Sequence, residues 1–335
     1  MRVLHETDAD LGYLRNKTLA VIGYGNQGRA QALNLRDSGM RVLIGSIRDA
    51  GAEQAERDGF TTVPISAAVE QADVLALLIP DEVQREVYDA QIAPALRRGQ
   101  ALDFAHGYNI HFGLIRPPQH VDVFMVAPRM IGINVRQSFE KGRGVPAYLA
   151  VAQDASGQAR QLALAWAKGI GATRAGVLET SFAEETELDL FTEQAVWPII
   201  MRDLLLSYEV LVEAGFPAEM VALELYGSGE AAEVFKQMAR VGIIKQMRLH
   251  SQTSQYGTLS RAAAMLPEEA RGRMQQALQG IRSGSFAREW ADEQRAGYPR
   301  FETLRRLADE HAINRAEELG RHMLKRAGLD DDPAE

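Results

Sequence analysis

The hydrophobic pattern of this chain changes near residue 181. Before that point, short apolar segments bounded by glycine, proline or polar residues alternate with stretches of helical periodicity. Apolar residues at helical spacing predict a helix over Asn26–Ser38. Repeated strand–helix–strand units imply a doubly wound parallel α/β sheet with helices on both faces. The segments predicted as strands are Thr18–Ile22, Arg41–Ile44, Val74–Ile79, Ala101–Phe104, Val121–Val126 and Ala147–Val151.

The second half carries almost no strand signal, and its apolar residues recur at helical spacing. Pro198 should kink the first of its helices, because proline lacks an N–H and its ring clashes with the preceding turn. We therefore expect an α/β domain over 1–181, an all-α domain over 182–328 and a frayed tail over 329–335. The predicted helices are Glu184–Ala214, Ala218–Tyr226, Glu230–Val241, Pro267–Ser283 and Phe301–Arg326.

Composition narrows the class of protein. The 335 residues are 46% hydrophobic and 24% charged, which suits two folded domains and excludes a disordered chain. The net charge of −8 and the lack of a basic block argue against nucleic acid as a partner. The sequence has no cysteine, so disulfides, cysteine–zinc sites and thiol nucleophiles are excluded. We find no signal peptide and no apolar run of roughly 20 residues, so we expect a cytoplasmic protein without a membrane partner.

A glycine-rich turn directly follows the first predicted strand and opens the helix behind it. Glycines in this context let the backbone approach a pyrophosphate, while free N–H groups and the helix dipole receive its negative charge. A tight turn without a ligand is the alternative, but the strand–turn–helix context favours dinucleotide binding. The residues of the turn are Gly23, Tyr24, Gly25, Asn26, Gln27 and Gly28.

The tip of the second predicted strand bears on the choice of cofactor. An NAD-preferring site usually places a carboxylate here to bind the ribose hydroxyls, and this tip has none. Arg48 could instead pair with a 2′-phosphate, with Ser46 as a hydrogen-bond donor. Asp49 would oppose this if it pointed inward, and an ordinary polar loop is the alternative. The loop favours NADP over NAD.

Two acids of the long predicted helix are candidates for a metal site. Asp189 and Glu193 are four residues apart, so they share one face. Their neighbours make most of that helix apolar, which predicts burial, and buried carboxylates need partners. In a chain without cysteine, Mg²⁺ is a suitable partner for clustered oxygen ligands. Two acids on a solvated stripe are the commoner alternative.

Further candidates lie in two other segments. Glu224 and Glu230 flank a Tyr-Gly-Ser-Gly sequence, although Glu230 also suits the start of a helix and Glu224 a solvated face. His106 follows the fourth predicted strand, at the carboxyl edge of the sheet, where doubly wound folds bind ligands. It is a candidate for acid–base chemistry or for organising water, and a purely structural histidine is an equal alternative.

Taken in order along the chain, several segments resemble the ketol-acid reductoisomerases, in the short form called class I. The resemblance covers nearly the whole chain. Its best stretch surrounds Asp189. The segments that carry it are Val21–Gly28, Ala32–Gly39, Ile79–Gln84, Phe104–His111, Thr173–Val177, Glu184–Glu187, Asp189–Gln194, Ile281–Gly284 and Phe286–Trp290.

This resemblance implies an NADPH-binding Rossmann domain and an all-α, knotted domain for metal, substrate and dimer contacts. The implied reaction converts 2-acetolactate, or 2-aceto-2-hydroxybutyrate, to a 2,3-dihydroxy acid in branched-chain amino-acid biosynthesis. It proceeds by a Mg²⁺-dependent alkyl shift and then hydride transfer. Two metals suit the chemistry, because they polarise the ketone and hydroxyl oxygens and hold developing alkoxide charge.

The resemblance also assigns roles to individual residues. In short-form enzymes the third and fourth carboxylates and the serine come from a partner subunit, which implies a homodimer with a shared active site and leaves larger assemblies open. The implied metal ligands are Asp189, Glu193, Glu224 and Glu230, with the active-site residues His106 and Arg129 and the substrate-contacting Ser251. The implied cofactor contacts are Tyr24 to Gln27, Asp81, Glu82, Val83, Gln84 and Gly132.

Two departures from the family pattern affect the site. Arg129 stands where the family usually has a lysine, and arginine is bulkier, planar and effectively never deprotonated. The third and fourth carboxylates are normally four residues apart, whereas Glu224 and Glu230 are six apart and Ser228 occupies the i+4 position. Glu230 would therefore require a two-residue insertion, and Glu233 is the fallback ligand.

Three functions follow from these observations. The first is ketol-acid reductoisomerase activity itself. The second is a divergent paralogue that uses NADPH to reduce another 2-keto acid or an imine, with little alkyl migration. The third is a non-catalytic NADP-binding regulator, which is disfavoured because unpaired buried acids cost several kcal/mol and would have no reason to persist. Whether one or two Mg²⁺ bind stays open.

Overall fold

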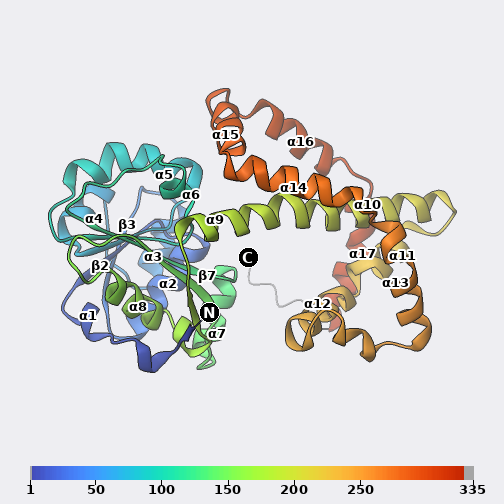
Figure 1. Ribbon diagram of the computed structural model, residues 1–335, viewed down its shortest axis with the longest axis horizontal. Helices are drawn as coiled ribbons and strands as arrows, with labels where there is room; N and C mark the ends of the chain where they lie inside the picture. Colours follow the sequence, from blue (N-terminus) through green and yellow to red (C-terminus); the bar gives the residue numbers. More distant parts are fainter. Residues whose placement is uncertain (1, 328–335) are drawn as a thin grey trace. The chain divides into compact units, whose positions relative to one another are not determined.

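A nine-stranded sheet organises the first part of the chain in the computed structural model, which describes residues 2–327 (Figure 1). The chain divides into two compact units, Met1–Leu188 and Asp189–Glu335. The tail predicted over 329–335 lies outside the described residues. Across the part of the chain that is described, no helix has the length and apolar content needed to cross a membrane.

The first unit alternates strands with helices, as the sequence predicts. Its strands are β1 (Val3–Leu4), β2 (Thr18–Ile22), β3 (Arg41–Gly45), β4 (Thr62–Val63), β5 (Val74–Leu77), β6 (Ala101–Phe104), β7 (Asp122–Pro128), β8 (Ala147–Gln153) and β9 (Val177–Glu179). Its α-helices are α1 (Gly12–Arg15), α2 (Asn26–Asp37), α3 (Ala50–Arg57), α4 (Ile65–Gln71), α5 (Asp81–Val87), α6 (Tyr108–His111), α7 (Gly132–Glu140) and α8 (Ala159–Gly169). Short helical turns are η1 (Glu6–Asp8), η2 (Tyr88–Ile92), η3 (Ala93–Ala95) and η4 (Ala172–Arg174).

The strand order is β1-β9-β8-β7-β6-β5-β2-β3-β4. The run from β4 to β7 is parallel, which confirms the doubly wound arrangement expected from the sequence. Beyond it, β8 pairs antiparallel with β7, and β1 antiparallel with β9, so this side of the sheet is mixed. The reason is local: β8 begins beside the end of β7, where Ala147 pairs with Pro128, and therefore runs back along it.

Both faces of the sheet are covered, and a hydrophobic cluster fills each interface. Helices α1, α2 and α8 pack on one face, around the fully buried Trp166. Helix α4 and the turn η2 pack on the other face with the neighbouring strand residues. Central strands such as β2 are buried on both sides, which explains their continuous apolar runs. This packing fixes the carboxyl edge of the sheet.

The second unit is entirely helical in the part of the chain that is described. Helix α9 (Phe182–Phe191) leads into it, followed by η5 (Thr192–Val196), α10 (Trp197–Glu213), α11 (Ala218–Ala222), η6 (Leu223–Gly227), α12 (Glu230–Val241) and η7 (Lys245–Leu249). The remaining helices are α13 (Gln252–Met265), α14 (Glu269–Arg282), α15 (Ser285–Arg295), α16 (Pro299–Asp309) and α17 (Ile313–Ala327). A small core surrounds Tyr208, Val221 and Ile313.

Two helix predictions need correction. The long helix predicted over Glu184–Ala214 is interrupted by the π-turn η5, directly before Pro198, because a wide turn accommodates the proline that a regular turn cannot. The helix predicted over Phe301–Arg326 is two helices. His311 Nδ1 accepts a hydrogen bond from the Ile313 N–H at 3.2 Å, and the Asn314 amide donates to carbonyls that end α16, so polar side chains separate the two. Helices α13 and α15 were not predicted.

Candidate active site

The glycine-rich turn between β2 and α2 has the three features that pyrophosphate binding requires. Gly23 adopts a left-handed conformation (φ 90°), which makes the tight turn. A side-chain carbon on Gly25 would meet no heavy atom of the described residues within 4 Å, so this surface is open to a ligand. One on Gly28 would lie 2.2 Å from the Gly23 carbonyl oxygen, so the helix packs closely on the strand. These are the three glycine roles of a dinucleotide-binding turn.

Asn26 and Gln27 of this turn hold the adjacent β7–α7 turn in place. The Gln27 amide donates to the Met130 carbonyl oxygen at 2.8 Å, and Asn26 Oδ1 accepts from the Ile133 N–H at 3.2 Å. A side-chain carbon on Gly132 would lie 2.0 Å from the Asn26 carbonyl oxygen. The side chains of Asn26 and Gln27 are therefore engaged with the β7–α7 turn, and any cofactor contact they make falls to their backbone.

Tyr24 is also tied to the protein. Its hydroxyl donates to Asp58 Oδ2 at 2.9 Å, and its ring packs edge-on against Phe60. Burial and the adjacent Asp58 carboxylate raise the pKa of Tyr24 above its usual value. The neutral phenol thus remains a hydrogen-bond donor and supports the floor of the turn.

The loop after β3 presents a cation. Asp49 caps helix α3, because its Oδ1 accepts from the Ala52 N–H at 2.8 Å. Its carboxylate is therefore engaged with the helix. The Ser46 N–H donates to the Val63 carbonyl oxygen at 3.1 Å, which anchors the start of the loop. Arg48 is exposed, and within the described residues it makes no ion pair or hydrogen bond.

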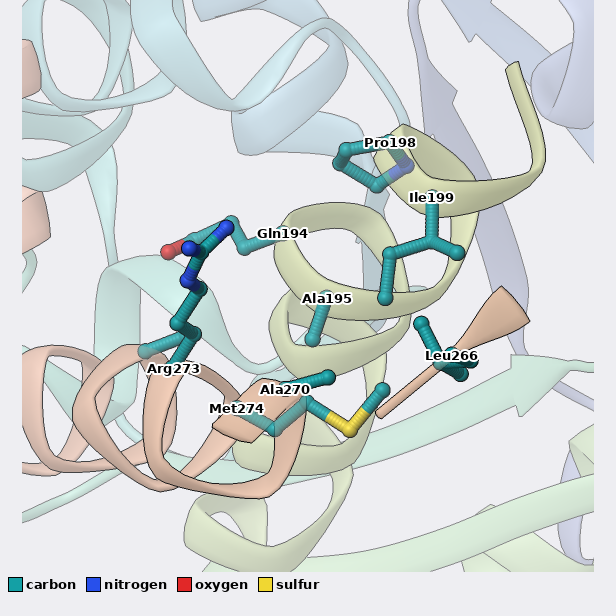
Figure 2. A pocket seen from close by; sticks show the side chains of 9 residues that line it. Gln194, Ala195, Pro198, Ile199, Leu266, Ala270, Arg273 and Met274 are labelled. Atoms are coloured by element: carbon teal, nitrogen blue, oxygen red, sulfur yellow. The ribbon is translucent and has the colours of Figure 1, made fainter. Parts of the chain in front are cut away.

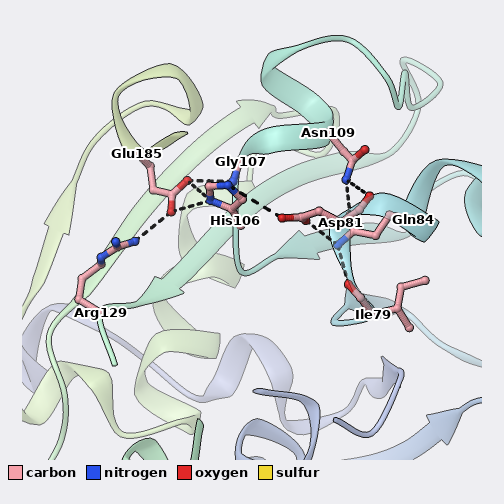
Figure 3. Close-up of polar contacts among 8 residues, drawn as sticks. All are labelled: Ile79, Asp81, Gln84, His106, Gly107, Asn109, Arg129 and Glu185. Atoms are coloured by element: carbon pink, nitrogen blue, oxygen red, sulfur yellow. Dashed lines mark hydrogen bonds and ion pairs between the residues drawn. The ribbon is translucent and has the colours of Figure 1, made fainter. Parts of the chain in front are cut away.

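A buried carboxylate, Glu185, organises the other end of the sheet edge (Figure 3). It comes from the first turns of α9 and its side chain is fully buried. Its Oε2 accepts from His106 Nδ1 at 3.0 Å and from the Gly107 N–H at 2.9 Å. Its Oε1 accepts from the Arg129 guanidinium, also at 3.0 Å. Both oxygens are thus engaged by donors from the loops that follow β6 and β7.

This arrangement fixes the histidine and the arginine. With Nδ1 held by Glu185, the Nε2 atom of His106 faces away, 3.9 Å from Asp81 Oδ2. The Arg129 guanidinium also lies over the Tyr148 ring, 5.1 Å from its centroid. A buried charge of either sign would be costly alone, and here opposite charges and a backbone N–H compensate one another.

Gly107 allows this close approach. A side-chain carbon at this position would lie 2.5 Å from Thr186 Oγ1 and 2.8 Å from the Phe182 carbonyl oxygen. Any larger residue would therefore push the His106 loop away from α9. The glycine is required by packing against a helix, and its effect is to bring His106 onto Glu185.

The predicted cofactor segment Asp81 to Gln84 begins α5 and is linked to α6. The buried Gln84 amide donates to the Ile79 carbonyl oxygen at 2.9 Å and to Asp81 Oδ1 at 3.1 Å. Asn109 donates from Nδ2 to Gln84 Oε1 at 3.1 Å and to the Asp81 carbonyl oxygen at 3.0 Å. Gln84 therefore supports the loop from within (Figure 3), while Glu82 and Val83 are exposed.

Asp189 follows Glu185 by one turn of the same continuous helix, α9. Ligand atoms of His106, Glu185 and Asp189 all lie within 4.8 Å of one another, which is the spacing of groups that hold a metal ion. Both Glu185 oxygens accept hydrogen bonds from His106, Gly107 or Arg129. Oxygen-rich donor sets of this kind suit Mg²⁺.

The other candidate acids lie on the second unit. Glu193 and Glu224 are exposed and sit on the π-turns η5 and η6, a local form often found at functional sites. Glu230 is exposed and begins α12, after Gly229 in a left-handed conformation. The residues described contain no further metal-type cluster that includes these three acids. Glu233 pairs with Lys236 at 2.9 Å, and Ser251 caps α13 by accepting from the Ser254 N–H at 3.2 Å.

Two expectations about α9 and η5 are revised. The apolar neighbours of Asp189 and Glu193 predicted a buried helix. Leu190 and Ala195 are buried, but Leu188 is 55% exposed and Val196 is 36% exposed. Residues 2–327 therefore leave part of this apolar surface uncovered. Glu185 was missed as a functional residue, although its position four residues before Asp189 was a readable signal, since it places both acids on one helix face.

Together, the fold and the site define a dinucleotide-dependent oxidoreductase with a helical second domain. Two family models match: "Acetohydroxy acid isomeroreductase, NADPH-binding domain" over residues 13–176, and "Ketol-acid reductoisomerase, C-terminal domain" over residues 182–326. Since these matches cover most of its length, the chain belongs to the ketol-acid reductoisomerase family.

Individual relatives agree with the family models. A ketol-acid reductoisomerase (NADP(+)) of Methanocaldococcus jannaschii is 44% identical over 333 residues, covering 98% of this chain and 99% of the relative. One from Pyrobaculum calidifontis is 47% identical over 326 residues, covering 97% and 98%. A solved structure of an NADH-preferring ketol-acid reductoisomerase from an uncultured archean matches with a TM-score of 0.91 and 40% identity, covering 97% of this chain and 99% of that one.

Proposed function

We propose that this chain catalyses the ketol-acid reductoisomerase reaction. In it, 2-acetolactate or 2-aceto-2-hydroxybutyrate undergoes an alkyl shift and a reduction by NADPH to give a 2,3-dihydroxy acid of branched-chain amino-acid biosynthesis. The observation that carries the proposal is the cluster around Glu185, where His106, Arg129 and Asp189 converge beside the carboxyl edge of the sheet. That edge is where doubly wound sheets bind their ligands.

NADPH is the proposed cofactor. The open surface at Gly25, beside the N-terminus of α2, suits the pyrophosphate. The exposed Arg48 suits a 2′-phosphate, because a guanidinium donates two parallel hydrogen bonds to such a group. Asp49, which would repel that phosphate if it pointed inward, is engaged as the cap of α3. This geometry favours NADPH over NADH, with Ser46 as a further donor.

Mg²⁺ is the proposed metal, and the donor set on α9 and η5 suits it. We assign Asp189 and Glu193 of one copy as ligands, completed by Glu224 and Glu230 of a second copy, with Ser251 contacting the substrate. Glu230 is preferred to the fallback Glu233, because the Glu233 carboxylate already accepts from Lys236 and Gln237. The number of metal ions bound is left to measurement.

In this proposal, residues of the first unit orient the reacting groups and balance the charge that develops on the substrate. Bound Mg²⁺ would polarise the ketone and hydroxyl oxygens, and bound NADPH would supply the hydride. Glu185 holds His106 so that Nε2 faces the site, where it can position a water molecule or move a proton. Arg129, held by the same carboxylate, supplies a fixed positive charge for developing oxygen charge.

One observation favours the second candidate function, a reductase of another 2-keto acid or an imine. Arg129 replaces a lysine expected from the family resemblance, and its guanidinium is held between Glu185 and the Tyr148 ring. It cannot donate and accept a proton near neutral pH. An enzyme in which the alkyl shift needs such a transfer would retain reduction and lose isomerisation.

Steady-state NADPH oxidation distinguishes the two functions. The enzyme is assayed with Mg²⁺ and either 2-acetolactate or 3-hydroxy-3-methyl-2-ketobutyrate, the rearranged acid that needs only reduction. Turnover of 2-acetolactate supports the reductoisomerase. Reduction of the rearranged acid alone supports the reductase, and no reaction with either compound contradicts the proposed substrate class.

We also propose that the active unit is a homodimer. Large apolar side chains such as Ile244, Tyr256 and Leu259 are more than 60% exposed on the second unit. Exposed apolar side chains in this number suit an interaction site, and a second copy would also bring the remaining carboxylates to the metal. The cytoplasmic location inferred from the sequence is part of the same proposal.

A further inference from the structure

The second unit contains a cavity that no residue of the proposed reaction site lines. It has a volume of about 180 Å³ and lies between the segment Gln194–Ile199 and helix α14, with Leu266 at one end (Figure 2). The lining set contains none of the cofactor, metal or substrate residues assigned above. The cavity is therefore a separate feature of the helical unit.

One end of the cavity is polar. The Nε2 atom of Gln194 is buried and has no hydrogen-bond partner among the residues described. A buried donor without a partner destabilises the fold unless a ligand or water satisfies it. The Arg273 guanidinium extends to the same end (Figure 2) and makes no ion pair or hydrogen bond within residues 2–327. Two unsatisfied donors, one of them charged, thus meet at one place.

The rest of the cavity is apolar. Ile199, Leu266 and Met274 line it away from the polar end (Figure 2), and Ala277 also belongs to the lining. An apolar cavity of about 150 Å³ is large enough to hold a benzene-sized molecule. The present cavity therefore has room for a short aliphatic chain together with a small polar head group.

We propose that this cavity binds a small amphipathic carboxylate, with the head group on Arg273 and Gln194 and the aliphatic chain against Ile199, Leu266 and Met274. A carboxylate is the complementary head group, because both protein groups are donors and one carries a positive charge. The two carboxylate oxygens would satisfy the guanidinium and the buried amide at the same time. This proposal does not depend on the reaction that the enzyme catalyses.

Calorimetric titration of the whole protein, with NADPH and Mg²⁺ present, tests the proposal, with isovalerate as the probe. Arg273→Gln should weaken binding at least about tenfold, because it removes a charged hydrogen bond. The matched control is Arg271→Gln, on the same helix but outside the cavity and paired with Glu268. It should leave the affinity unchanged within about twofold. The neutral amide of the probe should bind at least about tenfold more weakly to the wild type.

The same measurements would show whether something other than a carboxylate occupies the cavity. Equal affinity in the Arg273→Gln and Arg271→Gln variants would overturn the proposal. So would loss of binding when Mg²⁺ is chelated, because the probe would then occupy the reaction site. Failure of the wild type to bind the probe would also overturn the proposal. If Arg273→Gln then changes the sedimentation coefficient, the cavity belongs to a contact between copies instead. Ala277→Phe, which fills the cavity, should abolish binding and serves as the second variant.

Discussion

The two units of this chain bury apolar side chains to very different extents. In the first unit, the sheet and its helices enclose two continuous hydrophobic clusters, one on each face. In the second, nine apolar residues are buried among those described, whereas 21 large apolar side chains are exposed. The first unit is thus complete as a folded body. The second displays surface that folded monomers usually cover.

The candidate site residues follow the same division. His106, Arg129 and Glu185 are held by hydrogen bonds within the first unit. Glu224 and Glu230 are exposed on helices of the second unit. One half of the proposed site is therefore organised within the first unit, whereas the other half, in the proposal above, is completed by a second copy. Five predictions test this division, from the largest expected effect to the smallest.

Asp189→Asn should have the largest effect. It removes a proposed metal carboxylate while leaving the cofactor turn of the first unit untouched. Metal stabilisation of several kcal/mol corresponds to roughly a 1000-fold loss of Mg²⁺-dependent turnover. Steady-state kinetics measure that loss, and fluorescence titration should give an NADPH affinity within about twofold of the wild type. A variant with wild-type activity would contradict the metal assignment.

Leu259→Glu should disrupt assembly. Leu259 lies on α13, three residues from the equally exposed Tyr256 on the same face. A carboxylate buried in a subunit contact costs several kcal/mol, so the dimer dissociation constant should rise by roughly 100-fold or more. Sedimentation velocity measures this change. Tyr13→Glu, an exposed aromatic residue of the first unit, should leave the assembly unchanged.

Glu185→Gln should slow turnover by about 100-fold. The substitution keeps the shape but removes the charge that holds His106 and Arg129, and a misplaced general acid–base group costs on this order. The matched control is Glu184→Gln. Glu184 is exposed and accepts from Thr180 and Ser181 at the start of α9, so its loss should affect stability and not turnover. Similar kinetics in both variants would remove Glu185 from the site.

Arg129→Lys should change the balance between substrates by about tenfold. A lysine preserves the charge on Glu185, is smaller, and can exchange a proton. The alkyl shift demands tighter geometry than reduction. The rate ratio between the rearranged 2-keto acid and 2-acetolactate should therefore fall in the variant. The control is Arg136→Lys, which pairs with Asp37 at 2.7 Å away from the site. An unchanged ratio would mean that Arg129 is a tolerated substitution.

Much of the fold could be predicted because its signals are local. Thr18–Ile22 and Ala101–Phe104 were predicted to the residue, since each is a short apolar run buried on both faces of the sheet. The short strands Val3–Leu4, Thr62–Val63 and Val177–Glu179 were missed. Their sequences carry too few residues for a period, and they become strands by pairing with neighbours already in the sheet.

The parts of the site that depend on local sequence were also predictable. The glycine turn and the position of His106 follow from a local motif and a strand end. Glu185 was not assigned, because its role depends on His106, which lies 79 residues away along the chain. The spacing from Asp189 marks Glu185 as a candidate, but no local pattern reports its contact with His106. The expected burial of the Asp189 helix failed for a related reason, since apolar periodicity does not say which chain covers the surface.

The last prediction concerns the completeness of the first unit's core. Asp103 lies fully buried on β6, where its Oδ1 accepts from the Val126 N–H at 3.1 Å. Its Oδ2 has no partner among the residues described. Burial raises the pKa of Asp103 well above its usual value, so the fold favours the protonated form of this carboxyl. Because a buried carboxyl with an unpaired oxygen is destabilising, the apolar packing of the first unit must offset its cost.

The sign of the pH effect follows from proton binding. In the unfolded chain this carboxyl ionises near its ordinary pKa of about 4, whereas burial makes the folded chain hold the proton to higher pH. The folded state therefore binds more protons above about pH 4, and stability falls as pH rises, by up to about 1.4 kcal/mol per pH unit. Asp103→Asn keeps the acceptor for Val126 and cannot ionise. The difference in free energy of unfolding between this variant and the wild type should therefore shift in favour of the variant as pH rises from 5 to 8.

Urea unfolding can isolate this gain in the first unit. Trp166 is fully buried there, so its fluorescence reports the unit when Trp197 and Trp290 are replaced by phenylalanine. The control is Asp122→Asn. Both Asp122 oxygens accept from Ser156, its N–H at 2.9 Å and its hydroxyl at 2.6 Å, so an amide there should lose stability at every pH. If Asp103→Asn shows no gain with rising pH, the carboxyl is ionised in the folded state. A hydrogen-bond donor from outside the described residues must then contact the Asp103 carboxylate. The core of the first unit would in that case depend on a group that the unit itself does not supply.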